Sequence, residues 1–343
     1  MASTASQRDF SIAIAGYGWW GKHMAARLTH HETIAVAGIV EPRADLQDAV
    51  RQAGHTAYGT LDEVLALNTV DAVVLTTPNL LHEEQVVACA KAGKPVLCEK
   101  PLALTAASAR RAVAAVEDAG VPLAIGHERR FEPAMLALKN AIDAGELGTI
   151  MHAEAAFSHD KLIHVPKGDW RTSKTVCPAA GMTAMGIHLT DLLISFFGRV
   201  ETVQAMTANR ILGWETGDVV TVQLGFEAGM TATLSAVLYT PHFIRMHVFG
   251  HAAWVEVRNA SHPDTPGGKV TSVTAHSNAP HQSTVFEWDD AVMRNLEAFR
   301  ASVKGEAHYP FTHEELIHNI EVLEAITRSA EDRRTVHIAE LAP

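Results

Sequence analysis

The sequence is poor in cysteine, with three in 343 residues. Cys89, Cys98 and Cys177 are widely separated and form no CxxC pair, which argues against a disulfide framework and a zinc site. We expect buried thiols. The sequence also lacks an apolar run near about 18 residues, and its polar start, Met1–Asp9, contains no apolar signal region. These absences predict a cytoplasmic protein that does not associate with membranes.

Basic residues are outnumbered, with 28 Lys and Arg against 39 Asp and Glu and a net charge of -11. Such a charge repels nucleic-acid phosphates and anionic membrane surfaces, so neither is an expected partner. The hydrophobic fraction of 47% is ordinary for a globular protein, so we expect a folded chain. The length allows two domains at about 100 to 200 residues each.

Short apolar runs alternate with helical patterns from residue 11 to about 126. The runs are Ile12–Ala15, Ile34–Val40, Ala72–Leu75, Val96–Leu97 and Val121–Ile125. Continuously apolar strands are typical of a parallel sheet that helices cover on both faces. Thr105 is a plausible N-cap of one such helix, which Gly120 ends. Residues 1–126 are therefore predicted to form an α/β Rossmann domain.

The pattern changes after about residue 130. Helical patterns occur at Phe131–Ala144, Gly181–Phe197, Ala291–Val303 and His313–Ala330, and alternating apolar and polar residues occur at Thr221–Leu224, Thr231–Val237 and Trp254–Val257. Alternation is typical of half-exposed antiparallel strands. Residues 127–343 are therefore predicted to form an α+β domain with a large open, mostly antiparallel sheet. An open sheet with an exposed apolar face also predicts a homodimer or homotetramer.

A glycine-rich loop, Gly16-Tyr17-Gly18-Trp19-Trp20-Gly21, follows the first strand and opens a helix. In this setting the first glycine permits a tight turn, the second lets the backbone approach a pyrophosphate, and the third lets helix and strand pack closely. The helix N-terminus then offers free N–H groups to the anion. The loop predicts a dinucleotide site.

Two charged residues follow the second long strand. Glu41 lies about 25 residues after Gly16, near the position of the acidic group that binds the adenosine ribose hydroxyls, which favours NAD. Arg43 offers a contact to a 2′-phosphate instead, so NADP stays open. The alternative is that both are solvated loop charges.

Further motifs resemble those of the glucose-fructose oxidoreductase, inositol dehydrogenase and rhizopine catabolism (Gfo/Idh/MocA) family over nearly the whole chain. They are Thr77-Pro78-Asn79 with His82, Cys98-Glu99-Lys100-Pro101, Arg129-Arg130-Phe131-Glu132-Pro133, Trp170-Arg171 and Gly186-Ile187-His188-Leu189-Thr190-Asp191. With the loop, the resemblance implies cofactor contacts from Gly16, Tyr17, Gly18, Trp19, Trp20, Gly21, Glu41, Arg43, Thr77, Pro78, Asn79, His82, Glu99, Lys100, His127, Trp170 and Arg171.

The resemblance also implies the acid–base residues. Lys100 stands where the family carries its catalytic lysine beside the nicotinamide, and partial burial near a cationic ring suits a lysine to proton exchange. The alternative is a surface lysine at a strand end. Pro101 is expected to fix the turn that aims Lys100, although a sequence does not show whether the bond is cis. His188 stands where a family histidine acts on the reacting hydroxyl, the alternative being a core or capping histidine.

One position departs from the family pattern. The family commonly places an aspartate four residues before the histidine, and this chain has Ala184. Thr183 is one residue off and has no useful acid–base pKa. We therefore expect Lys100 and His188 to divide the proton transfer, a weaker alternative being a changed reaction or lost activity.

Substrate contacts are expected from residues near the second domain's motifs. The predicted set is Lys100, Arg129, Arg171, Thr183, His188 and Asp191. For Arg129 and its neighbour Arg130, interdomain salt bridging is an equal alternative. His159 and His164 fit no metal-binding spacing, so no metal is expected.

Together these features predict an NAD-dependent oxidoreductase, with NADP possible, that moves a hydride to or from a secondary alcohol carbon of a sugar, inositol or related polyol. Three alternatives stay open. One is redox-neutral glycoside cleavage or epimerisation with retained cofactor, another is a dihydrodiol or hydroxy-acid dehydrogenase, and the third is a nonenzymatic NAD-binding sensor.

Overall fold

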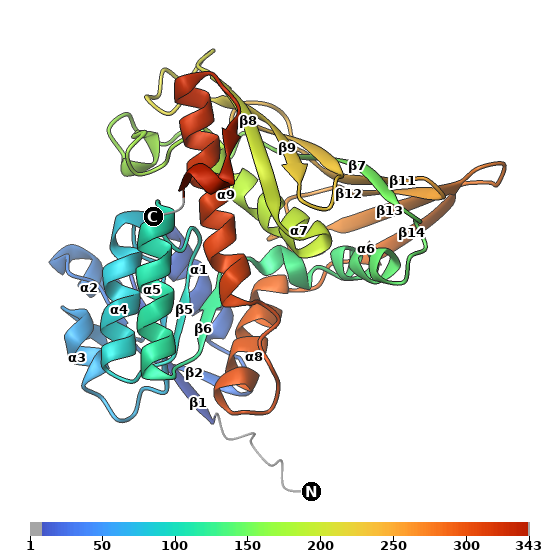
Figure 1. Ribbon diagram of the computed structural model, residues 1–343. Coiled ribbons are helices and arrows are strands. Elements are labelled where there is room, and N and C mark those ends of the chain that lie inside the picture. Colours follow the sequence, from blue (N-terminus) through green and yellow to red (C-terminus); the bar gives the residue numbers. More distant parts are fainter. Residues whose placement is uncertain (1–8, 342–343) are drawn as a thin grey trace, which may run out of the picture. The chain divides into compact units, whose positions relative to one another are not determined.

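The computed structural model describes residues 9–341, which divide into two compact units (Figure 1). The first unit contains the chain up to Ala103 together with Ala107–Gly126 and Leu296–His313. The second contains Leu104–Ala106, His127–Asn295 and the chain from Glu314 onward. One boundary thus falls between residues 126 and 127, where the sequence pattern changes. Sequence reasoning did not predict that Leu296–His313 returns to the first unit.

The first unit is built on a six-stranded parallel sheet with the order β3-β2-β1-β4-β5-β6. Its strands are β1 (Phe10–Ala15), β2 (Ile34–Val40), β3 (Ala57–Tyr58), β4 (Ala72–Leu75), β5 (Val96–Cys98) and β6 (Leu123–Ile125). Its helices are α1 (Trp19–Leu28), α2 (Ala44–Gln52), α3 (Leu61–Leu65), α4 (His82–Lys91) and most of α5 (Ala106–Ala119). This strand order is that of a Rossmann fold, as predicted.

The segment from Leu296 to His313 packs against the strands of the first unit. It includes the end of α8 (Ala291–Val303), where Phe299 packs edge to face on Phe10 with ring centroids 6.3 Å apart. Farther along, the Tyr309 hydroxyl donates to the carbonyl oxygen of Ile125 at 3.1 Å. These contacts are made between residues nearly 200 positions or more apart, so local periodicity could not reveal them.

The second unit is built on a nine-stranded sheet with the order β14-β13-β12-β11-β7-β10-β9-β8-β15. Among the described strand pairs of this second sheet, β7 with β10 is parallel and the others are antiparallel. The strands are β7 (Ile150–Ser158), β8 (Val200–Ala208), β9 (Val219–Phe226), β10 (Thr231–Val237), β11 (Phe243–Gly250), β12 (Ala253–Asn259), β13 (Lys269–His276), β14 (Gln282–Glu287) and β15 (Val336–His337). The predicted mostly antiparallel sheet is confirmed.

Three helices lie wholly or mainly in the second unit: α6 (Pro133–Asp143), α7 (Ile187–Phe197) and α9 (His313–Asp332). The sequence predicted one helix over Gly181–Phe197, but a π-helical turn over Met182–Gly186 precedes α7. A Cβ on Gly186 would lie 2.4 Å from the Met182 sulfur, so glycine permits this packing. Such wide turns often occur at functional sites, and this one holds Ala184 just before His188.

None of the described helices is both long and apolar enough to cross a membrane. The three cysteines are free and buried, as the sequence predicted.

Candidate functional site

The glycine-rich loop joins β1 to α1 and needs glycine at two positions for packing. Gly16 has a φ of +97°, and a Cβ on Gly21 would lie 2.0 Å from the Gly16 carbonyl oxygen. A Cβ on Gly18 would meet nothing within 4 Å. The first turn of α1 contains no acidic residue, and Gly18 gives it no side-chain cap. The helix therefore presents backbone N–H groups to open space, which suits an anion.

Glu41 follows β2 and turns its carboxylate toward this loop. The side chain is 3% exposed, and its Oε2 accepts from the Tyr17 backbone N–H at 3.2 Å. Its Oε1 accepts from the backbone N–H and the Nε of Arg43, both at 3.1 Å. The Glu41 carboxylate and the phosphate loop are thus held together, while Trp19, a predicted cofactor contact in this loop, is 62% exposed.

The loops after β4 and β5 are also tied together. His82 is buried, with Nδ1 2.6 Å from the Pro101 carbonyl oxygen and Nε2 3.0 Å from the Thr77 carbonyl oxygen. Burial lowers the pKa of His82. Thr76, which sequence reasoning missed, donates its hydroxyl to the Gly16 carbonyl oxygen at 2.9 Å and so braces the phosphate loop. Pro78 precedes the short turn that contains the buried Asn79.

Glu99 and Lys100 directly follow β5. The Glu99 carboxylate accepts from the Trp20 indole N–H and from the backbone N–H of Lys100. A Cβ on Gly126 would lie 2.5 Å from Glu99 Oε2, so only glycine leaves room for this carboxylate. Burial raises the pKa of Glu99 to about 7, and the nearby Lys100 charge opposes that rise. Lys100 is itself half-buried, and the Lys100–Pro101 bond is cis.

These features fit a nicotinamide dinucleotide. The open space at Gly18 and the N-terminus of α1 suit a pyrophosphate, and the Glu41 carboxylate suits free ribose hydroxyls. Gly18, the N-terminus of α1 and Glu41 all lie within the first unit.

In the second unit, the structure brings the predicted residues His127 and His188 together. Their rings meet edge to face with centroids 5.4 Å apart, and both side chains are buried. Glu128, which was not predicted, places its Oε1 3.9 Å from His188 Nε2. From α9, the Asn319 Nδ2 lies 3.0 Å from His127 Nε2. We call Glu128, His127, His188 and Asn319 the His188 cluster.

The Asp191 carboxylate is bound by Arg130. Its Oδ1 and Oδ2 accept from the guanidinium at 2.7 and 2.8 Å, and Asp191 is 1% exposed. Arg130 also pairs with Glu315 at 3.2 Å. Arg130, Asp191 and Glu315 all lie within the second unit. Because these contacts join protein groups only, a contact from Asp191 to substrate stays a prediction.

Arg129 is likewise paired inside the second unit. It donates to Glu132 at 2.8 Å and to Asn259 at 3.0 Å, and its guanidinium lies 5.2 Å from the centroid of the Phe157 ring. Only 1% of the residue is exposed. Its predicted substrate contact therefore also stays a prediction.

Three further predicted residues lie elsewhere in the second unit. The Thr183 hydroxyl donates to the Pro178 carbonyl oxygen at 2.8 Å. The Arg171 guanidinium lies 4.2 Å from the centroid of the Trp170 ring in a short turn. Their predicted roles stay predictions.

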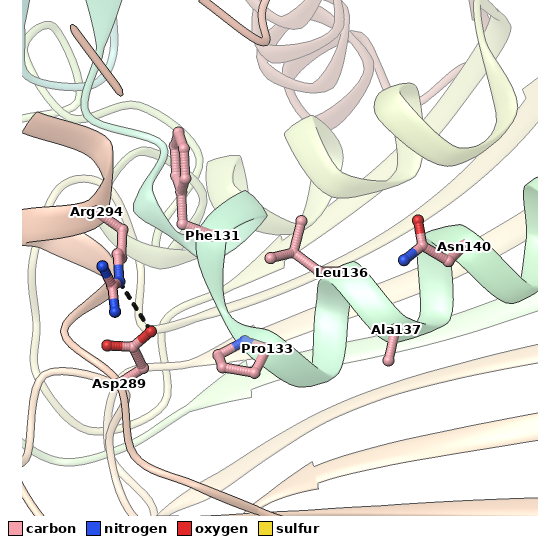
Figure 2. Close-up of a pocket in the computed structure, with 7 residues that line it drawn as sticks. All are labelled: Phe131, Pro133, Leu136, Ala137, Asn140, Asp289 and Arg294. Atoms are coloured by element: carbon pink, nitrogen blue, oxygen red, sulfur yellow. Dashed lines mark hydrogen bonds and ion pairs between the residues drawn. The ribbon is translucent and has the colours of Figure 1, made fainter. Parts of the chain in front are cut away.

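The second unit contains a pocket of about 380 Å³, and Figure 2 shows the residues that line it. It is lined by Phe131, Pro133, Leu136, Ala137, Asn140, Asp289 and Arg294, with an Asp289–Arg294 ion pair at 3.0 Å. None of these is a predicted site residue, so the cavity does not locate the site.

The chain matches two models of one family. Residues 10–127 match the model described as "Oxidoreductase family, NAD-binding Rossmann fold", and residues 135–256 match "GFO/IDH/MocA C-terminal domain". Together the two models cover most of the chain, including the phosphate loop, Lys100 and the π-helical turn.

Three curated relatives are similar to the chain. Trans-1,2-dihydrobenzene-1,2-diol dehydrogenase of Mus musculus is 32% identical over 203 residues, which span 59% of each chain. D-xylose 1-dehydrogenase (NADP(+)) 2 of Haloferax volcanii is 28% identical over 95% of this chain and 98% of the relative. Inositol 2-dehydrogenase 1 of Saccharopolyspora erythraea is 31% identical over 80% of this chain and 78% of the relative.

A solved structure, that of aldose-aldose oxidoreductase from Caulobacter crescentus, is 23% identical with a TM-score of 0.84. The match covers 96% of this chain and 100% of that chain. At this identity the likeness shows the fold alone.

Proposed function

Because the chain belongs to the Gfo/Idh/MocA oxidoreductases, whose first domain is an NAD-binding Rossmann fold, we propose that it transfers a hydride to or from a secondary alcohol carbon of a sugar, inositol or related polyol. One observation carries this proposal. Ala15 pairs in register with Val40 and Leu75, and Leu75 with Cys98. The residues that follow these strand ends, including Gly16, Glu41 and Lys100, therefore emerge along one edge of the sheet, where open parallel sheets bind ligands.

The nicotinamide, when bound, accepts or supplies the hydride. Lys100 and His188 exchange the hydroxyl proton, and Glu41 accepts hydrogen bonds from the adenosine ribose. NAD is the proposed cofactor because the Glu41 carboxylate is already turned toward the loop. Arg43 pairs with Glu41 at 3.1 Å, so its guanidinium lies beside the same ribose position and NADP stays the alternative cofactor.

A parallel screen with NAD and NADP tests the proposal. Sugars, inositols, hydroxy acids and aromatic dihydrodiols are offered to the purified protein, and reduced nicotinamide is followed by its absorbance. We expect turnover with a polyol or sugar and a preference for NAD. Product formed without net reduced nicotinamide would instead support redox-neutral chemistry, and a strong preference for NADP would contradict the role of Glu41.

The dihydrodiols have a specific reason to be in the screen. The relative from Mus musculus, named for such a substrate, matches 59% of this chain. Turnover of dihydrodiols with none of sugars or inositols would replace the proposed substrate class but keep the hydride transfer.

We also propose a homodimer or homotetramer that works in the cytoplasm. Three exposed apolar side chains, Met206, Phe243 and Val285, lie on one face of the second sheet. Covering such a surface favours self-association. The three free thiols are consistent with a reducing compartment. Light scattering of the purified protein tests the assembly, and a monomeric mass would contradict it.

A further inference from the structure

The His188 cluster contains a carboxylate near His188 that the sequence analysis did not identify. Ala184, four residues before His188, offers no acid–base group. The Glu128 carboxylate, from the short turn Glu128–Phe131 that follows β6, lies 3.9 Å from His188 Nε2. The two side chains are 18% and 6% exposed, so water screens their charges only partly.

We propose that Glu128 is a positioning residue for His188 and supplies the carboxylate that position 184 does not. This inference rests on the proposed function. In the oxidative direction, a bound nicotinamide would take up the hydride, and the hydroxyl proton would pass to Lys100 or His188. The ionised Glu128 stays unchanged, holds the imidazole in place and favours its protonated form.

Among the described residues, the ring and carboxylate groups whose contacts near His188 are known do not supply this charge. His127 faces it from the same turn as Glu128, and the Phe157 ring of β7 lies 6.1 Å away between centroids. Asp191 shares α7 with His188, but both its oxygens accept from Arg130. His159 lies beyond Phe157, and burial lowers its pKa to about 4, which leaves it neutral near pH 7.

The direct test is Glu128→Gln in the full chain, with the His188 imidazole titrated by NMR. The signal is assigned by its absence in His188→Gln. Loss of a negative charge at this distance favours neutral imidazole, so we expect the titration midpoint to fall by about one pH unit. Glu314→Gln, which removes an exposed carboxylate that pairs with Arg199, is the matched control and is expected to leave the midpoint unchanged. An unchanged midpoint in Glu128→Gln overturns the proposal.

Activity supplies the second readout. With a substrate from the screen, Glu128→Gln is expected to lower kcat about tenfold, with little change in KM, and to move the acid limb of the kcat profile to lower pH. Ala184→Asp in the Glu128→Gln background is expected to return the acid limb of the kcat profile to its wild-type pH. The reason is that residue 184 is partly exposed and lies one turn from His188. If the acid limb of the kcat profile stays at the same pH in Glu128→Gln, the proposed positioning role of Glu128 is wrong.

The NMR readout needs no substrate, so it separates two kinds of failure. If no alcohol is oxidised but the midpoint shifts, the pairing of Glu128 with His188 stands and the proposed function fails. If a polyol is oxidised and the midpoint does not shift, the function stands and the role of Glu128 fails.

Discussion

The phosphate loop of the first unit and the His188 cluster of the second unit are built in opposite ways. The loop is six consecutive residues whose closest packing contact, between Gly21 and Gly16, is local. The cluster joins residues from three distant segments, with His127 and Asn319 separated by 192 positions. A spacing pattern can therefore reveal the first region, whereas only the folded chain shows that the residues of the second region lie together.

The two regions also treat polar groups differently. The loop leaves the N-terminus of α1 facing open space at Gly18. Around the cluster, charges are buried in pairs, such as Arg130 with Asp191. The first region is therefore suited to receive an anion, and the second to hold an imidazole in a fixed place.

The largest effect is expected from Lys100→Met, which leaves the phosphate loop intact and removes an acid–base group. We expect kcat to fall about 10²- to 10⁴-fold, the usual contribution of such a group, while the Kd for NAD changes little. Steady-state kinetics and a cofactor titration measure both. Lys91→Met, an exposed change on α4, is the control. Full activity in Lys100→Met would contradict its role.

Asp191→Asn tests the second region as a structural network. The change leaves the pairing of Arg130 with Glu315 in place. Since breaking a buried ion pair leaves a poorly compensated charge, we expect a loss of about 3 kcal/mol in unfolding free energy. Chemical denaturation measures this loss. The control Glu314→Gln changes an exposed side chain, and its unfolding free energy is expected to stay within about 0.5 kcal/mol of the wild type. A stable Asp191→Asn with a raised KM would instead support substrate binding.

The sequence predicted the phosphate loop and most strands of the first unit because the signals for them lie between residues close in sequence. Continuous apolar runs marked β2 and β4 at the bounds the structure gives, and the glycine spacing marked the loop. It missed β3, whose two residues are too short for a pattern, and Thr76, whose hydroxyl bond to Gly16 spans 60 positions.

The second region was harder to predict. His188 was found through a motif, but Glu128 was not, because nothing in a helical or strand period links position 128 to position 188. Its one sequence signal was its place between His127 and Arg129, two residues already singled out. The π-helical turn was missed because its apolar residues continue a helical pattern into α7.

Glu99→Gln tests whether the carboxylate that binds Trp20 of the phosphate loop makes the stability of the protein depend on pH. Burial raises the pKa of Glu99 to about 7 from a usual 4.5, so the folded state binds this proton more tightly than the unfolded state. The wild type therefore loses stability as pH rises from about 4.5 to 7, by up to about 3 kcal/mol. Glu99→Gln should be more stable than wild type at pH 8 and closer to it at pH 5. Denaturation of the cofactor-free protein at both pH values measures this, and a pH-independent difference would contradict it.

Two alanine substitutions in the phosphate loop are expected to have the smallest effects on stability and to differ in kind. Gly21→Ala places a Cβ 2.0 Å from the Gly16 carbonyl oxygen, so β1 and α1 must move apart. We expect a loss of about 1–3 kcal/mol in unfolding free energy. Gly18→Ala meets nothing within 4 Å and should leave stability nearly unchanged, yet weaken NAD binding because its methyl group enters the proposed pyrophosphate space. If Gly18→Ala binds NAD as the wild type does, the space at Gly18 is not where the pyrophosphate lies.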